Sequence, residues 1–557
     1  MSSTFDFIIV GSGPSGASLA AKLAASDTRP TVLLLEAGPS SLDKESLIGF
    51  DRFPLALNQA PLNWPLTTTP QEHLNQRCID LPTGKALGGS SAINVAMWTV
   101  GHAADYDEWA RRVDDDSFNW SNVQRHLTGM TAYNRTGPQT WGRYSRPTSW
   151  DQEESAEIQL EMAENNLKQA IPILDAFVEC GHAVNTDPNS GEPLGVGVLP
   201  LTMHDSWRVT AAVAFLDNVP SNLAIMTDVL VEKILFEGTT AVGVSAGDQT
   251  FLASKEVIIS AGALRTPQLL MVSGVGPRNH LEDKIITCVK DLPVGQTLQD
   301  HTVFAMMWEV KPTFSDPIVH LFDPATMALA RSEFIKKGTG PLKDFYAPMP
   351  VVYLRDPGVA ESEEIKALGD DAMHLLHPTL PLGEICPVLP GVGGDFSKNY
   401  LRISAFNMAT TSVGSVTLKS ANMADDPIVD PNYLSTAFDG RNAVALARAA
   451  RGVMRDSSLK NSIIGDEWVP KGDSDDEVLE FVKDTAISAW HYSCSVRMAK
   501  EDDGSGCLDS DFRVFGINGL RVADMSAAPL LPQCHPQAVA YLIGDILAEK
   551  LREEYAL

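Results

Sequence analysis

The chain has 557 residues, of which 44% are hydrophobic and 20% are charged. This composition excludes a largely disordered protein, and the length predicts two domains or one large domain with a cap. Lys and Arg number 43 against 71 Asp and Glu, so the formal net charge is −28. This negative charge repels polyphosphate chains and anionic lipid surfaces, and it disfavours nucleic acid and membranes as partners.

The seven cysteines are scattered, with no CxxC pair and no Cys/His spacing suited to zinc. They predict neither a disulfide framework nor a metal site. The sequence enters an apolar stretch close to its first residue, and no later apolar run reaches membrane-spanning length. As written, it predicts a cytoplasmic protein; secretion remains an alternative for a chain from which a leader has been trimmed.

The first motif is a βαβ pattern. An apolar strand, predicted over 7–10, runs into Gly11-x-Gly13-x-x-Gly16, a helix and a second apolar strand that ends at Glu36. Gly11 permits a tight turn, Gly13 lets the backbone approach a pyrophosphate, and Gly16 lets the helix pack closely on the strand. Glu36, 20 residues after Gly16, can accept hydrogen bonds from ribose hydroxyls. The unit predicts dinucleotide binding, with FAD and NAD as alternatives.

A second glycine cluster follows in "PTGKALGGSSAINVAMWTVGHAADYDEW" (82–109), which includes Gly88, Ser91 and Asn94. It is too rich in glycine and small hydroxyl side chains for regular structure. Such a loop can place several backbone N–H groups and an amide against a flat polar ring or a phosphate. The alternative interpretation is a surface loop without a ligand.

This stretch resembles the first signature of the glucose–methanol–choline (GMC) oxidoreductases, and "GALRTPQLLMVSGVGP" (262–277) resembles the second. Further similarity lies in "LPVGQTLQDH" (292–301), in "GSVTLKSANMADDPIVDPNYLS" (414–435) and in the C-terminal segment. The resemblance therefore spans the chain. It points to a fungal-type member that is similar to aryl-alcohol oxidases and dehydrogenases.

The resemblance implies an α/β fold, α+β overall, with two domains. A Rossmann-type FAD-binding domain would comprise residues 1–133, 204–300 and 487–557. A substrate-binding domain with a mostly antiparallel sheet would comprise residues 134–203 and 301–486.

The resemblance also implies which residues contact FAD. The ADP half would be held by Gly11, Gly13, Gly16 and Glu36, the isoalloxazine and ribityl groups by Gly88, Ser91 and Asn94, the adenine region by Val229, and the pyrophosphate or ribityl region by Asp524. Ile93 stands where some relatives have the histidine that carries the flavin covalently, so we expect non-covalent FAD.

Two histidines complete the predicted site. His535 opens the helical pattern "PQCHPQAVAYLIGDILAEKL" (532–551), and His491 lies in "AWHYSCSVRM" (489–498). A single histidine at a helix start is more often a capping or surface residue, but together they resemble the catalytic pair of the family. Hydride transfer from an alcohol carbon to flavin N5 requires a base for the hydroxyl proton, here His491, and a partner that steadies the developing alkoxide, here His535. Trp490 and Trp98 are candidate pocket walls, with core packing as the alternative.

The apolar character of 327–357 and 374–394 favours an apolar or aromatic alcohol as the small-molecule substrate, such as a secondary-metabolite intermediate. The electron acceptor would be O₂ or an external compound. Two alternatives remain open: a non-redox lyase or cyclase that retains flavin, and a binding protein in which FAD is structural. The sequence predicts no oligomeric state.

Overall fold

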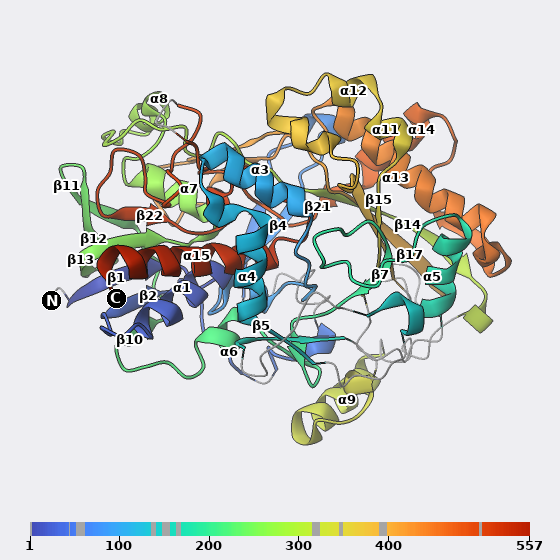
Figure 1. The fold of residues 1–557 in the computed structure, drawn as a ribbon, viewed down its shortest axis with the longest axis horizontal. Coiled ribbons are helices and arrows are strands. Elements are labelled where there is room, and N and C mark those ends of the chain that lie inside the picture. Colours follow the sequence, from blue (N-terminus) through green and yellow to red (C-terminus); the bar gives the residue numbers. More distant parts are fainter. Residues whose placement is uncertain are drawn as a thin grey trace.

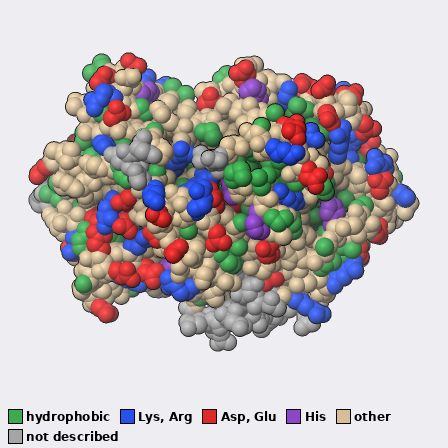
Figure 2. Space-filling model, turned by 45° about the horizontal axis from the view of Figure 1, so that its top comes forward, with side chains coloured by type: hydrophobic (Ala, Val, Ile, Leu, Met, Phe, Trp, Pro, Cys, Tyr) green, Lys and Arg blue, Asp and Glu red, His purple; other side chains and the backbone are tan. Residues whose placement is uncertain are grey.

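The computed structural model describes residues 3–43, 45–51, 62–134, 141–146, 156–162, 169–314, 323–344, 349–388, 398–500 and 504–557. Two large sheets organise the molecule, and Figure 1 shows them side by side, with both chain termini next to the first sheet. Acidic and basic side chains are interspersed over the face in Figure 2. Within the described ranges, no helix combines the length and the apolar character needed to cross a membrane.

The first sheet has seven strands in the order β10-β2-β1-β13-β12-β11, with β22 paired to β13. The pairs of β1 with β2 and β13, of β2 with β10, and of β13 with β22 are parallel, so the carboxyl ends of these strands meet at one edge. Its strands are β1 (Ser3–Val10), β2 (Val32–Leu35), β10 (Leu223–Met226), β11 (Lys233–Glu237), β12 (Thr240–Ala246), β13 (Gln249–Ile259) and β22 (Leu520–Val522).

The predicted βαβ unit is confirmed, although β1 begins at Ser3 rather than at residue 7. Its apolar half, Phe7–Val10, is buried between β2 and β13, and Glu36 directly follows β2. Helix α1 (Pro14–Ala24) starts with a proline. Proline lacks an N–H, but an N–H in the first helical turn has no partner within the helix, so no helical hydrogen bond is lost. A Cβ on Gly16 would lie 2.0 Å from the Gly11 carbonyl oxygen, so only glycine permits this close packing of helix and turn.

Helix α15 (Gln537–Tyr555) lies along the first sheet and packs against α1 (Figure 1). A Cβ on Gly544 would lie 2.3 Å from the Ser15 carbonyl oxygen, so the two backbones approach closely at this point. Lys22 and Asp545 form an ion pair between the same helices. The other helices that connect this part of the chain are α3 (Ala103–Val113), α4 (Trp120–Met130), α6 (Ala211–Phe215), α7 (Gly262–Val272) and α8 (Arg278–Asp283).

The second sheet has seven strands in the order β20-β14-β17-β16-β15-β7, with β21 paired to β14. All of these pairs are antiparallel. Helix α13 (Ala437–Asp456) packs against β16 and β17. The strands are β7 (Gly195–Leu199), β14 (Thr302–Val310), β15 (Met349–Leu354), β16 (Gly383–Val388), β17 (Tyr400–Asn407), β20 (Ile463–Trp468) and β21 (Ile487–Ser488).

The remaining described α-helices and two-stranded pairs lie outside the two large sheets. The helices are α5 (Ala170–Glu179), α9 (Pro324–Lys337), α10 (Pro341–Asp344), α11 (Pro357–Ala360), α12 (Glu363–Lys366) and α14 (Asp475–Thr485). The two-stranded pairs are β3 (Asn63–Thr67) with β4 (Asp80–Gly84), β5 (Thr131–Asn134) with β6 (Ile158–Glu161), β8 (Met203–His204) with β9 (Trp207–Arg208), and β18 (Ser415–Thr417) with β19 (Ile428–Asp430).

The predicted α/β architecture is confirmed, with a sheet that has a parallel core and a second, antiparallel sheet. The strands of the first sheet come from the segments predicted for the FAD-binding domain. The strands of the second sheet come from the other segments, except β21, which lies just inside the segment 487–557 and pairs with β14. The residue boundaries of the domains remain a prediction.

The crossing of α1 and α15 yields a test of packing. We expect Gly544→Ala to lower the midpoint of thermal unfolding, because the added methyl meets a backbone oxygen that cannot move freely, an overpacking effect of about 1–3 kcal/mol. Gly452→Ala is the matched control, since a Cβ at this position in α13 has only the Asp456 carboxylate near it, 4.0 Å away. That variant should be stabilised by about 1 kcal/mol or less. Equal shifts in the two variants would contradict this packing.

Candidate active site

A cavity lies between the carboxyl ends of the parallel strands of the first sheet and one face of the second sheet. Its lining includes Gly11 after β1, Glu36 after β2 and Ser260 after β13. On the opposite side it includes Val303 from β14 and Phe406 from β17. Ligands of open parallel sheets bind at this end of the strands, where loops and helix N-termini present backbone N–H groups.

One end of the cavity is formed by the glycine motif. An added Cβ on Gly13 would meet no atom within 4 Å, so open space lies beside this backbone. Glu36 accepts hydrogen bonds from the backbone N–H of Ser12 at 3.1 Å, from its hydroxyl at 2.6 Å and from the N–H of Gly38 at 2.8 Å. Burial raises the pKa of the Glu36 carboxyl, and these hydrogen bonds oppose that shift. A carboxylate has about four acceptor positions, so Glu36 can still accept from a ligand hydroxyl.

The second glycine cluster forms a tight turn, η3 (Gly89–Ala92), that begins after Gly88 in the left-handed region at φ 93°. The Ser91 hydroxyl donates to the Gly88 carbonyl at 2.6 Å and accepts from the N–H of Ala211 at 2.8 Å. The loop is thereby attached to the start of α6, and its backbone has one defined conformation at the edge of the cavity.

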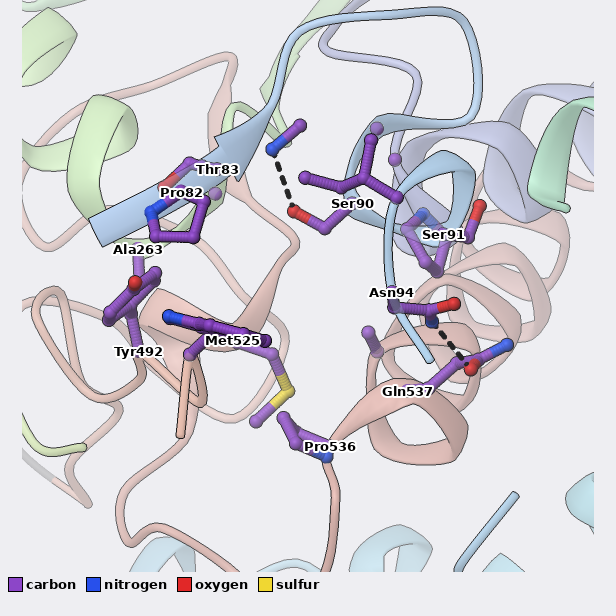
Figure 3. A pocket seen from close by; sticks show the side chains of 18 of the residues that line it. Pro82, Thr83, Ser90, Ser91, Asn94, Ala263, Tyr492, Met525, Pro536 and Gln537 are labelled. Atoms are coloured by element: carbon purple, nitrogen blue, oxygen red, sulfur yellow. Dashed lines mark hydrogen bonds between the residues drawn. The ribbon is translucent and has the colours of Figure 1, made fainter. Parts of the chain in front are cut away.

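Asn94 is held from two sides. The buried guanidinium of Arg208 donates to the Asn94 backbone oxygen at 2.7 Å and to its side-chain oxygen at 2.9 Å. The Asn94 amide donates in turn to Gln537 Oε1 at 2.7 Å. Figure 3 shows Asn94 and Gln537 on one side of the cavity and Ala263 and Tyr492 on the other side.

Asp524 links the C-terminal segment to the second signature. It accepts hydrogen bonds from the N–H of Gly262 at 2.9 Å, the hydroxyl of Thr266 at 2.5 Å and the N–H of Ser526 at 2.7 Å. Burial raises the pKa of this carboxyl. Asp524 therefore fixes the start of α7 where that helix meets the cavity.

At the other end of the cavity, four side chains form a continuous chain of contacts. His491 Nε2 lies 3.0 Å from His535 Nδ1, and His535 Nε2 lies 2.9 Å from Glu384 Oε1. On the other side, His491 Nδ1 lies 2.9 Å from His301 Nδ1. All four residues are buried. The predicted pair is thus in direct contact, and each histidine has a further partner.

The backbone around His491 is firmly held. Its N–H donates to Asp300 at 2.7 Å, and Asp300 also accepts from the hydroxyls of Tyr433 and Ser488, each at 2.5 Å. Burial raises the pKa of Asp300 to about 7. The preceding residue, Trp490, has a left-handed backbone (φ 63°), an unfavourable conformation that turns the chain between β21 and His491.

The electrostatic environment keeps two of the imidazoles neutral. Burial lowers the pKa of His491 well below its usual value. Burial lowers the pKa of His301 to about 3. Both rings are therefore uncharged near neutral pH, and a neutral His491 has one ring nitrogen that can accept a proton.

The structure brings most of the predicted site residues together. The cavity is lined by Gly11, Gly13, Glu36, Ser91, Asn94, Val229, Trp490, His491, Asp524 and His535. Gly16 and Gly88 lie behind this lining, where they shape the backbone. Trp98 is also outside it, buried in the core with its ring 6.1 Å from that of Tyr541.

His301 and Glu384 were not predicted from the sequence. His301 ends the segment 292–301, for which no chemical role was expected. Glu384 is a single acid within the apolar strand "GEICPV". An acid in an otherwise apolar strand indicates a buried partner, and this signal could have identified it.

The comparisons with known proteins agree with this geometry. A family model described as GMC oxidoreductase matches residues 5–303, and a second with the same description matches residues 410–544. An alcohol dehydrogenase (acceptor) of Pseudomonas putida is 31% identical over 566 residues, which cover 98% of this chain and 95% of that protein. The dehydrogenase pkfF of Emericella nidulans is 30% identical over 592 residues, which cover 99% of this chain and 93% of that protein.

Among solved structures, one that concerns FAD modification in formate oxidase of Aspergillus oryzae superimposes with a TM-score of 0.89 at 25% identity. The superposition covers 100% of this chain and 99% of that one. The family models together span most of the chain, and the relatives match nearly its full length. The chain therefore belongs to the GMC oxidoreductase family and is an FAD-dependent oxidoreductase.

Proposed function

We propose that the protein oxidises the CH–OH group of an apolar or aromatic alcohol, with His491 and His535 handling the hydroxyl proton. The observation that carries this proposal is the 3.0 Å contact between the two imidazoles inside the same cavity as the dinucleotide motif. Bound FAD would supply the hydride acceptor. The electron acceptor that reoxidises it would be O₂ or an external compound.

The residues that line the cavity suit an extended dinucleotide. Glu36 would accept hydrogen bonds from the ribose hydroxyls. The pyrophosphate would lie in the open space beside the Gly13 backbone, and Val229 would contact the adenine. The flavin half would lie against Ser91, Asn94 and Asp524. Ser91 and Asp524 accept hydrogen bonds from backbone N–H groups of α6 and α7, and the Asn94 amide donates to Gln537 of α15. Ile93 provides no nitrogen for a covalent link, so binding would be non-covalent.

The substrate hydroxyl would take the place of the direct contact between His491 Nε2 and His535 Nδ1. The ring of His535, whose Nε2 lies 2.9 Å from Glu384 Oε1, would hydrogen-bond to the alcohol oxygen through Nδ1. The neutral His491 accepts the hydroxyl proton as the carbinol carbon loses its hydride.

His301 has a supporting role in this arrangement. If His491 Nδ1–H donates to His301 Nδ1, the tautomer of His491 is fixed with its lone pair on Nε2, toward the substrate. The T-shaped contact of Phe406 with His535, with ring centroids 5.1 Å apart, adds an apolar wall beside the reacting carbon. Trp490 would line the same end.

Replacing Gly13 tests the cofactor site. Its φ of −61° suits any residue, and the space beside it is open, so we expect Gly13→Ala to fold but to contain several-fold less FAD, because the methyl occupies the path of the pyrophosphate. The measurement is the flavin absorbance per protein after purification. Gly11→Ala is the contrasting variant: with φ at 100° and a Cβ 2.3 Å from Ser260 O, it should lose folded protein. Full FAD content in Gly13→Ala would contradict this placement.

Replacing His491 tests the base. We expect His491→Ala to retain FAD and to lose about 100-fold or more in the rate of flavin reduction by alcohols. The rate is followed anaerobically by bleaching of the flavin band near 450 nm. His126→Ala is the control, since this buried histidine pairs with Asp545 away from the cavity and should not alter the rate of the FAD-loaded enzyme.

The same anaerobic experiment separates the reaction classes. Product formed while the band stays oxidised would support a lyase or cyclase instead of an oxidoreductase acting on alcohols. Loss of FAD from His491→Ala would make His491 structural. When air is readmitted after bleaching, a prompt return of the flavin band together with formation of hydrogen peroxide would identify O₂ as the electron acceptor.

Replacing Glu384 tests the charge beside His535. Glu384→Gln keeps an oxygen that can accept from His535 Nε2 but removes the negative charge, so we expect flavin reduction to slow by about 10-fold or more. The matched control is Glu309→Gln, which removes a carboxylate from β14 that pairs with Lys398 at 3.1 Å, outside the cavity. An unchanged rate in Glu384→Gln would show that His535 acts without this charge.

A further inference from the structure

Strand β17 carries a serine in the middle of the cavity wall. Burial alternates along this strand, so that Arg402, Ser404 and Phe406 are partly exposed, and all three line the cavity. Ser404 lies opposite Cys386 on β16 and opposite Ala305 on β14. Its position in the sheet is therefore defined by a neighbouring strand on each side, and its side chain borders the cavity.

The Ser404 hydroxyl has no hydrogen-bond partner among the residues that the structure describes. The other polar side chains that β16 and β17 present to the cavity are engaged. Arg402 has an interaction partner, and the Cys386 thiol donates to Glu384 Oε1 at 2.9 Å. Burial raises the pKa of this thiol well above its usual value, so the thiol keeps the proton that it donates. On this part of the wall, Ser404 is thus the polar side chain that can serve a ligand.

The strand geometry gives the distance of Ser404 from the histidine pair. Phe406, two residues further along β17, has its ring centroid 5.1 Å from that of His535. At about 3.3 Å per residue, Ser404 lies roughly 7 Å along the strand from this contact. An aromatic ring that carries a CH₂OH group spans a gap of this size. An alcohol held at the histidine pair would therefore bring the opposite side of its ring to the Ser404 hydroxyl.

Substrate binding changes the surroundings of this hydroxyl. Because the Ser404 side chain is partly exposed, water reaches it in the free protein. A purely apolar substrate would displace this water and leave the hydroxyl without a partner, which costs free energy. A substrate with an oxygen atom at the matching position would restore the hydrogen bond. The serine therefore favours substrates that carry such an oxygen over substrates that lack it.

We propose that Ser404 hydrogen-bonds an oxygen substituent on the side of the substrate ring remote from the reacting CH₂OH group. The substrate class is then an aromatic alcohol with a hydroxyl or ether oxygen para to that group. A serine hydroxyl can donate and accept, so it can pair with a phenolic O–H or with an ether oxygen. The inference rests on the proposed alcohol oxidation and adds the specificity of the same site.

The first test compares 4-hydroxybenzyl alcohol with 4-methylbenzyl alcohol, in which a methyl group replaces the phenolic hydroxyl. We expect Ser404→Ala to lower the second-order rate constant of flavin reduction by about 3- to 10-fold for the first alcohol, as for one neutral hydrogen bond, and by less than about 2-fold for the second. Comparing variants with the same alcohol cancels the electronic effect of the substituent. Ser404→Thr keeps the hydroxyl and should retain the preference. Ser245→Ala is the matched control, because Ser245 is a half-buried serine of β12 outside the cavity.

The second test measures binding without turnover, with ketones that have no carbinol hydrogen to transfer. The FAD-loaded enzyme is titrated with 4-hydroxyacetophenone and with 4-methylacetophenone, and binding is followed by the flavin spectrum. In Ser404→Ala, the Kd of the hydroxy compound should rise by about 3- to 10-fold, whereas that of the methyl compound should not rise. Neither Kd should rise in Ser245→Ala.

Equal losses for both alcohols in Ser404→Ala, or the same Kd of 4-hydroxyacetophenone in wild type and Ser404→Ala, would overturn the inference. A lower FAD content of Ser404→Ala would also overturn it, because the hydroxyl would then serve the cofactor. Flavin reduction that does not depend on Ser404 would leave the proposed function intact. If no alcohol reduces the flavin, the proposed function is refuted, and the ketone titration still tests Ser404.

Discussion

The contact between His491 and His535 joins the two halves of the molecule. His535 comes from the segment that leads into α15 beside the first sheet, whereas His491 follows β21 of the second sheet, and their nitrogens lie 3.0 Å apart. Glu384 and His301, also from the second sheet, extend this contact on both sides. Buried polar groups of this kind are costly when they lose their partners, so the contacts between these side chains favour one relative position of the two sheets.

The cavity exists because different segments meet at this contact. The parallel strands of the first sheet end at one wall, and their loops carry backbone N–H groups and the acid Glu36. The antiparallel second sheet supplies a flat apolar wall, with polar side chains at only a few positions. The predicted site residues are therefore concentrated where the carboxyl ends of one sheet face the surface of the other.

The sequence allowed prediction of features that are encoded locally. The spacing of Gly11, Gly13 and Gly16 is a property of one turn and one helix, and Glu36 is placed by the strand that precedes it. His491 and His535 were found through their resemblance to a family pattern rather than through their local context. The structure adds that both sit in one cavity, which local patterns cannot show.

Other features depend on tertiary pairing and could not be derived in this way. The contact of Glu384 with His535 requires that β16 lies beside the start of α15. Trp98 was a reasonable candidate for a pocket wall, because its neighbours carry the glycine loop, but its ring lies in the core against Tyr541. An aromatic side chain near a binding loop has no local signal that separates these two outcomes.

The order of synthesis has a consequence for how this fold matures. Strand β22 completes the parallel part of the first sheet, and α15 covers α1, yet both are synthesised roughly 500 residues after β1. At about 5–20 residues per second, the glycine turn after β1 waits on the order of half a minute or more for its packing partner. A nascent chain stalled before residue 520 would therefore expose to chaperones the surface of α1 that packs against α15 in the folded protein.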